Sequence, residues 1–340
     1  MSVKSWLDRL RIDPYILALV ATVGVASILP CRGVSAVVMG DVTDFAIGLL
    51  FFLYGTRLSS EAVVQGITNW RLQVTVLCST FVLFPLLGIG LAWLTKPLLG
   101  PNLAFGLTFL CLLPSTVQSS IAFTSIARGN VAAALCCASI SNLLGIVITP
   151  VLVGLILSSQ TGGISASSVK DIVLQLLVPF VAGQLLRPWL KGWIGRHRQI
   201  LSYVDRGSIL LVVYTAFSEG VVNGIWSKLD LGNLALLLVV NLLLLATVLC
   251  LTTWGSRRLG FSKEDEIAIV FCGSKKSLAS GIPIANVLFP ASAVGLIVLP
   301  LMLFHQVQLM ACAALARGYA RRQEGTGNAK EAPVPSRPGT

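Results

Sequence analysis

Two adjacent lysines, Lys275 and Lys276, lie in the middle of a stretch that is otherwise apolar enough to cross a membrane. The stretch runs from Glu266 to Phe289, which places Lys275 roughly 14 Å from one end and roughly 21 Å from the other at the helical rise, near the centre of a hydrocarbon core about 30 Å thick. A lysine there costs on the order of 3 kcal/mol unless it faces water, protein or an anion. Glycine, serine and proline surround the pair, so we predict a broken helix that packs in protein or lines a cavity. Charged, broken helices are typical of transporter sites.

The composition indicates a polytopic membrane protein. Of the 340 residues, 55% are hydrophobic and 11% are charged, whereas soluble domains carry about 25% charge. The net charge of +11 comes from basic residues at the ends of apolar runs, which indicates membrane topology and excludes nucleic acid as a partner. The motifs HExxH and G-x-S-x-G are absent. We therefore expect no enzyme activity, and no cofactor apart from a possible coupling ion.

The two ends of the chain are predicted to lie outside the membrane. Met1 to Asp13 is polar and basic and lacks a small-residue cleavage site, so we expect no signal peptide. Residues 323–340 are polar and rich in glycine and proline, so we predict a disordered cytoplasmic tail. The eight cysteines show no CxxC spacing and are expected to be small buried side chains.

The apolar runs predict an all-α fold of ten transmembrane helices. With the N-terminus in the cytoplasm, cytoplasmic segments carry all but a handful of the 25 lysine and arginine residues, which predicts that both termini are cytoplasmic. Five plus five spans imply that the second half inserts upside down, as an inverted repeat with halves of about 1–160 and 161–322. The expected spans are 14–30, 43–58, 72–95, 102–127, 131–158, 171–190, 207–226, 231–254, 266–289 and 291–316.

A second break is predicted in the fourth span, the counterpart of the ninth. Pro114 removes a backbone donor, and the polar residues Ser115, Thr116, Gln118, Ser119 and Ser120 follow it near mid-membrane. Interrupted spans at matching positions of the two halves point to a shared site, so the breaks at Pro114–Ser119 and Gly273–Ser277 should meet. Helix N-termini at such a crossing carry partial positive charge and suit an anion. Alternatively, the hydroxyl groups merely satisfy the broken backbone.

At these residues the chain resembles the bile acid:sodium symporter (BASS, SBF-like) transporters. The similarity covers about residues 5–320, and the segments that carry it include Ala127-Arg128-Gly129-Asn130, SISNLLGIVITP, LVPFVAGQLLRP and CGSKKSLASG. The resemblance implies ten helices, a panel and a core domain, and crossed discontinuous helices 4 and 9. It also implies a possible sodium site near Ser119, Ser120, Ser141 and Asn142.

The ninth span departs from the family pattern. Sodium-coupled members typically have an acidic residue, then Gly-Met-Gln-Asn; alignment on Gly273 places Phe271 at the acid and the lysine pair at Gln-Asn. An ammonium group can occupy the space of a cation, but it cannot coexist cheaply with sodium a few ångströms away in a low dielectric. Sodium coupling is therefore doubtful and proton coupling becomes possible. For the lysines, we weigh a functional role against that of a cation bonded to helix-break carbonyls.

These inferences predict a secondary transporter in the plasma (inner) membrane that moves an organic anion, either bile-acid-like or a small carboxylate, by alternating access. The alternative is a protein with the transporter fold that regulates or binds without transport. Besides the lipid bilayer and the anion, no partner is predicted, and the oligomeric state stays open. The candidate substrate- or ion-binding residues are Pro114, Thr116, Gln118, Ser119, Ser120, Ser141, Asn142, Gly273, Ser274, Lys275, Lys276 and Ser277.

Overall fold

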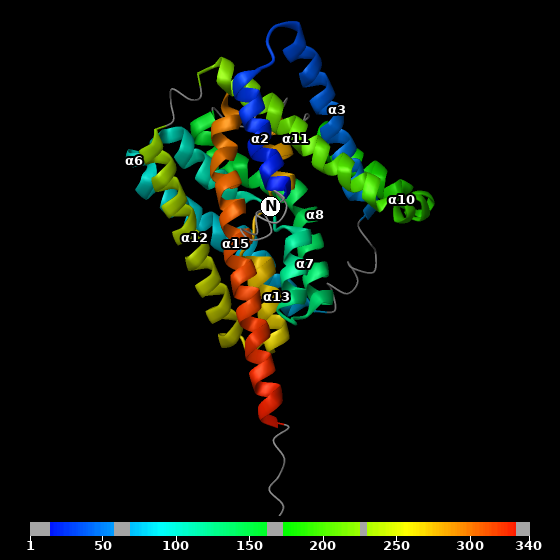
Figure 1. The fold of residues 1–340 in the computed structure, drawn as a ribbon, viewed down its shortest axis with the longest axis vertical. Helices are drawn as coiled ribbons and strands as arrows, with labels where there is room; N and C mark the ends of the chain where they lie inside the picture. The colour runs from blue at the N-terminus through cyan, green and yellow to red at the C-terminus, as the bar shows by residue number, and fades with distance from the viewer. Residues whose placement is uncertain (1–13, 58–68, 162–172, 225–229, 331–340) are drawn as a thin grey trace, which may run out of the picture.

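The computed structural model describes residues 14–57, 69–161, 173–224 and 230–330, and within these ranges it contains helices and turns but no strand. Figure 1 shows the arrangement. The elements are α2 Pro14–Ile28, α3 Val34–Arg57, α5 Trp70–Cys78, the π-helical turn η1 Ser79–Leu83, α6 Phe84–Leu112, α7 Val117–Ile126, α8 Val131–Thr161, the π-helical turn η2 Val173–Leu177, α10 Val178–Arg196, α11 Arg198–Val222, α12 Leu231–Arg258, α13 Lys263–Gly273, α14 Leu278–Leu288 and α15 Ala291–Lys330.

Each predicted span falls on a helical segment, and eight segments of the described chain are long and apolar enough to cross a membrane. One of these segments, Trp70–Leu112, joins α5, η1 and α6. It is broken at Gly100, whose positive φ of 77° suits glycine, and Pro101 follows. The predicted boundary between the third and fourth spans lies at this position. The apolar stretch of α2, Leu17–Ile28, is shorter than a full span.

Several predicted boundaries differ from the structure. Helix α3 begins at Val34 rather than at residue 43, because Asp41 and Asp44 do not interrupt the helix. The basic loop predicted at 191–206 is largely helical, since α10 ends at Arg196 and α11 starts at Arg198. Basic residues mark where a helix leaves the hydrocarbon, and this need not be where the helix ends.

Helix α15 also differs, because it continues to Lys330, into the segment predicted to be disordered. The remaining residues of the predicted tail, 331–340, lie outside the described part of the chain, as does the predicted polar segment 1–13.

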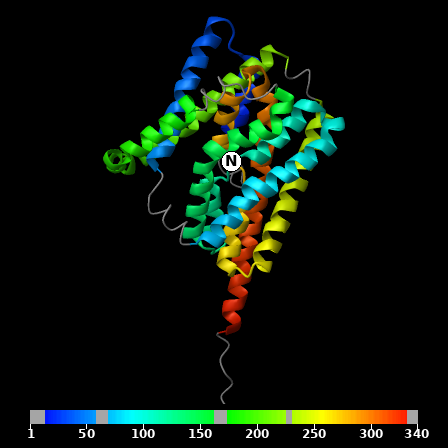
Figure 2. The same cartoon turned by 180° about the vertical axis from the view of Figure 1, so that it is seen from behind.

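The helices form two groups. Helices α2, α3, α10 and α11, which we call the panel group, contact one another; α5–α8 and α12–α15, the core group, form the larger bundle. Figures 1 and 2 show α3 and α10 on one side of the molecule and α6 and α12 on the opposite side. The groups meet where α11 packs on α14 and α15.

Helices α3 and α10 pack closely in the panel group because glycines face the opposite backbone. A Cβ atom on Gly55 would lie 2.0 Å from the carbonyl oxygen of Phe180, and one on Gly183 would lie 2.0 Å from that of Phe52. Small residues at helix interfaces allow such close approach in membranes. Arg57, the last residue of α3, lies beside Asp205 of α11.

Candidate functional site

The two predicted helix breaks lie in direct contact. One break separates α6 from α7 and contains Pro114; the other separates α13 from α14 and contains the lysine pair. The Ser277 N–H donates to the carbonyl of Pro114 at 2.9 Å, and the Thr116 hydroxyl donates to the carbonyl of Lys276 at 2.8 Å. The α13–α14 segment is also enclosed by protein, since nearly all residues of its most apolar stretch are buried. Broken backbone at membrane depth is therefore satisfied by protein groups.

Serine side chains satisfy the carbonyl groups at the end of α13. The hydroxyl of Ser120 donates to the carbonyl of Phe271 at 3.0 Å, and that of Ser115 to the carbonyl of Cys272 at 2.6 Å. Ser79 donates to the carbonyl of Gly273 at 2.8 Å. The last carbonyls of a helix have no intrahelical partner, so these serines stabilise the break. For Ser120, the observed contact matches the alternative in which the hydroxyl satisfies the broken backbone.

Lys276 satisfies the other break. Its Nζ atom donates to the carbonyls of Thr80, Cys111 and Leu113 at 2.9, 2.8 and 2.7 Å. Cys111 and Leu113 are at the end of α6, where carbonyls lack helical partners. In the π-helical turn, the Phe84 N–H bonds to Ser79, and the next donor would come from position 85, which is a proline without an N–H group. The ammonium group thus binds three carbonyls that the helices leave unpaired.

The backbone of Lys276 is also fixed, by Gln308 of α15. The Gln308 side chain accepts from the Lys276 N–H and donates to its carbonyl, each at 2.9 Å. Gln308 is fully buried, and its Nε2 also lies 2.9 Å from the Nδ1 of His305. Sequence reasoning missed Gln308, because a single glutamine in an apolar helix gives no sign of its partner.

Lys275 has a different environment from its neighbour. Its Nζ atom has no hydrogen-bond partner in the described part of the chain, and it lies 4.0 Å from the ring centroid of Phe123 and 5.4 Å from that of Phe271. Both lysines are fully buried. Aromatic faces attract a cation, more strongly when the site is dry. Phe123 separates this ammonium group from the cavity, whose wall it forms.

A cavity of about 560 Å³ lies between the panel group and the core group. Two helices begin at its wall: α7, whose N-cap is Thr116, and α14, whose N-cap is Ser277. Ser277 accepts from the Ser280 N–H at 3.2 Å, whereas the Thr116 hydroxyl does not cap α7 and bonds to Lys276 instead. The start of α7 therefore presents N–H groups that have no side-chain cap, a favourable place for a negative charge.

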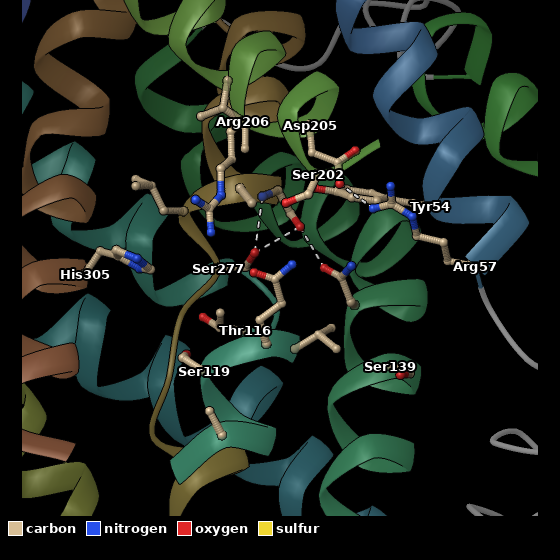
Figure 3. A pocket seen from close by; sticks show the side chains of 18 of the residues that line it. Tyr54, Arg57, Thr116, Ser119, Ser139, Ser202, Asp205, Arg206, Ser277 and His305 are labelled. Atoms are coloured by element: carbon tan, nitrogen blue, oxygen red, sulfur yellow. Dashed lines mark hydrogen bonds and ion pairs between the residues drawn. The ribbon is translucent and has the colours of Figure 1, made fainter. Parts of the chain in front are cut away.

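The panel group contributes charged side chains to the same cavity. Arg57 of α3 donates to the carboxylate of Asp205 on α11, and Arg206 also lines the wall. Figure 3 shows Arg206 pointing into the cavity above Ser277, while Arg57 lies across the cavity against Asp205. In the sequence, Arg57 and Arg206 served only as topology markers. Their cavity role was missed because it depends on how α3 and α11 pack.

The predicted site residues divide into two sets. Those that line the cavity are Thr116, Gln118, Ser119, Asn142 and Ser277. Those that the structure places behind its wall, outside the lining of this cavity as far as the chain is described, are Pro114, Ser120, Ser141, Gly273, Ser274, Lys275 and Lys276. In this conformation neither lysine lines the cavity, and both side chains are fully buried in the bundle.

Three of the four predicted sodium ligands, Ser120, Ser141 and Asn142, have hydrogen-bond partners within the protein. The Ser141 hydroxyl accepts from the Ser115 N–H at 3.1 Å, and the Asn142 side-chain oxygen accepts from Ser280 at 2.7 Å. The Ser119 hydroxyl is buried and has no partner in the described chain. Phe271 stands where the family pattern has an acid, and its carbonyl oxygen accepts the hydroxyl hydrogen bond of Ser120.

The apolar helices, the two broken helices and the cavity between helix groups define an integral membrane protein built like a transporter. The sequence profile of the SBF-like CPA transporter family matches residues 13–321. The chain therefore belongs to this transporter family, which bears out the resemblance seen in the sequence. No enzymatic family is indicated.

Named relatives extend over nearly the whole chain. "Uncharacterized protein PA2026" of Pseudomonas aeruginosa is 56% identical over 96% of this chain and 98% of its own length. "Putative symporter YfeH" of Escherichia coli is 54% identical over 92% of this chain and 94% of its own. "Sodium/bile acid cotransporter 7" of Rattus norvegicus is 28% identical over 89% and 91%.

Proposed function

We propose that this protein is a secondary transporter that moves an organic anion across the plasma (inner) membrane by alternating access. The observation that carries the proposal is the start of α7 and of α14 at one wall of the cavity. Helix N-termini carry a partial positive charge and unpaired N–H groups, which bind carboxylates and similar anions. The relatives named as symporters and as sodium/bile acid cotransporters support transport as the activity.

The proposed architecture is ten crossings in two inverted halves. The 43-residue segment Trp70–Leu112 is about 64 Å long at the helical rise, roughly twice the hydrocarbon thickness. Its first part, before Gly100, makes one crossing, and its second part joins α7 in the next. Helices α13 and α14 together make the ninth. Both termini are then cytoplasmic, and a reporter active only in the cytoplasm, fused after Arg322, tests this. A silent but intact fusion would contradict it.

We further propose that transport does not use sodium. The Lys276 ammonium places a buried cation at the helix breaks, bonded to three carbonyls, and the alignment offers no acid at Phe271. Any proton dependence would arise at Lys275, which one aromatic ring separates from the cavity. In this account the lysine pair is a fixed part of the core group, and movement occurs between the core group and the panel group.

A tethered anion at the helix starts tests the proposal. Ala279 is the second residue of α14 and lines the cavity, so Ala279→Asp would place a carboxylate where the substrate anion binds. The isosteric Ala279→Asn is the neutral control. We expect uptake of organic anions into sealed vesicles to be lost in the first variant and retained in the second. Binding without flux in the unmodified protein would support the regulatory alternative, and equal flux in both variants would refute the proposed site.

A further inference from the structure

Arg206 is a cation of the cavity that has no carboxylate partner among the residues that the structure describes. Its guanidinium carbon lies 5.4 Å from the ring centroid of Tyr15. This cation–π contact attracts the guanidinium but does not neutralise its charge. The other cation of the wall, Arg57, is neutralised by Asp205. Of the charged residues that line the cavity, two arginines therefore face one aspartate, which leaves a net charge of one positive unit.

The rest of the wall is mostly apolar and partly aromatic. Tyr54, Phe123 and Phe180 contribute rings, and Leu143 and Ile146 contribute aliphatic surface. When an apolar ligand displaces water from such a cavity, an unpaired guanidinium becomes costly unless the ligand carries an anion to it. A guanidinium also offers a planar pair of N–H donors that matches a carboxylate or a sulfonate.

From these observations we infer that Arg206 binds the anionic group of the substrate, and that the substrate is a singly charged organic acid whose apolar part contacts the rest of the cavity wall. This inference rests on the proposed function, and it adds a residue of the panel group to a site otherwise built from the core group. A second negative charge on the substrate would find no unpaired cation in the described wall of the cavity, because Arg57 already forms an ion pair with Asp205.

The position of Arg206 also gives substrate binding a dependence on conformation. Arg206 belongs to α11 of the panel group, whereas the starts of α7 and α14 belong to the core group. An anion that contacts both Arg206 and the helix starts would lose one of these contacts when the core group moves relative to the panel group. A ligand shifts the equilibrium between two conformations only by the difference in its affinity for them. Arg206 would contribute such a difference, because the anion contacts it in one arrangement of the two helix groups and loses it in the other.

A matched series of probes tests the charge rule. Naphthoate, naphthalenedicarboxylate and naphthamide share one ring system and carry one, two and no negative charges. Binding to the purified full-length protein is measured by calorimetry or by ligand-induced thermal shift. We expect naphthoate to bind best. Arg206→Gln should weaken naphthoate binding by about tenfold to a hundredfold, the range for a charge-assisted contact, and Arg206→Lys should recover part of the loss.

Arg258 offers a matched control, because its guanidinium also stacks on an aromatic ring, Trp254, at 5.5 Å, but it does not line this cavity in the described structure. Arg258→Gln should leave naphthoate binding unchanged. Asp205→Asn releases Arg57, so it should shift the preference toward naphthalenedicarboxylate.

The outcomes separate the inference from the proposed function. Unchanged naphthoate binding in Arg206→Gln, together with loss of binding in Ala279→Asp, would overturn the role of Arg206 and leave the anion site standing. Stronger binding of the dianion than of naphthoate to the unmodified protein would overturn the single-charge rule. No binding of any of the three probes to the unmodified protein would overturn both the inference and the proposed function.

Discussion

The adjacent lysines should respond oppositely to removal of their charge. Replacing Lys276 with methionine keeps a side chain of similar length but leaves the carbonyls of Thr80, Cys111 and Leu113 buried without a donor. Each unsatisfied buried group costs about 1–3 kcal/mol. Three such groups cost about 3–9 kcal/mol together, and relief of the desolvation penalty of the buried ammonium offsets part of this cost. We expect Lys276→Met to destabilise the protein by about 3 kcal/mol or more.

Lys275→Met removes a buried ammonium that has no hydrogen bond in the described structure. The loss is the attraction to the rings of Phe123 and Phe271, about 2 kcal/mol for a dry cation–π contact. The gain is the desolvation penalty of one buried ion, several kcal/mol. The net effect should be close to zero or stabilising, so the two variants should differ by about 3 kcal/mol or more, which is the lower end of the cost of leaving three buried carbonyls without a donor.

The assay is thermal unfolding of the unmodified protein and both variants in one detergent, with the rate of unfolding at a fixed temperature as a second readout, because membrane proteins often unfold irreversibly. Lys276→Met should unfold at lower temperature and faster, and Lys275→Met should match or exceed the unmodified protein. Equal effects of the two substitutions, or greater damage from Lys275→Met, would refute the assignment of the three carbonyl contacts to Lys276.

Two further predictions follow from the same structure. Anion flux in the unmodified protein should not respond to sodium, whereas adding Phe271→Glu to Lys275→Gln and Lys276→Asn should create a measurable response; strong sodium stimulation of the unmodified protein would contradict sodium-independent transport. Gly183→Ala should destabilise by about 1–3 kcal/mol through overpacking, because its Cβ would lie 2.0 Å from a backbone oxygen, while Gly192→Ala, with nothing within 4 Å, should be neutral; thermal unfolding distinguishes them, and equal effects would contradict the close packing of α3 and α10.

The helix breaks could be predicted because their causes are local. Pro114 lacks an N–H group, and glycine and serine beside the lysines disfavour a continuous helix, so the sequence marks both positions. Their contact could be expected as well, because each break leaves backbone groups that need partners at membrane depth. The hydroxyls near Pro114 were candidate ligands, and several of them are in fact the partners of those backbone groups.

The direction of the lysine side chains could not be predicted, because it depends on the neighbouring helices. Lys276 points to the end of α6 and to the carbonyl of Thr80, which is available because of a π-helical turn that no local pattern marked. Lys275 lies against Phe123, whose ring separates it from the cavity. The same holds for Arg206, which in the sequence looks like a basic residue that only sets membrane topology. It lines the cavity because α11 begins eight residues earlier, at Arg198.

Movement of the core group relative to the panel group is tested most directly by the accessibility of the cavity from the two sides of the membrane. A cysteine at Ala279, on the cavity wall, is treated with a membrane-impermeant maleimide in sealed vesicles of either orientation, and its modification is read by peptide mass spectrometry. Ala285→Cys, on the same helix and fully buried, is the control. We predict that Ala279→Cys reacts from both sides and Ala285→Cys from neither. Reaction of Ala279→Cys from one side only would contradict alternating access.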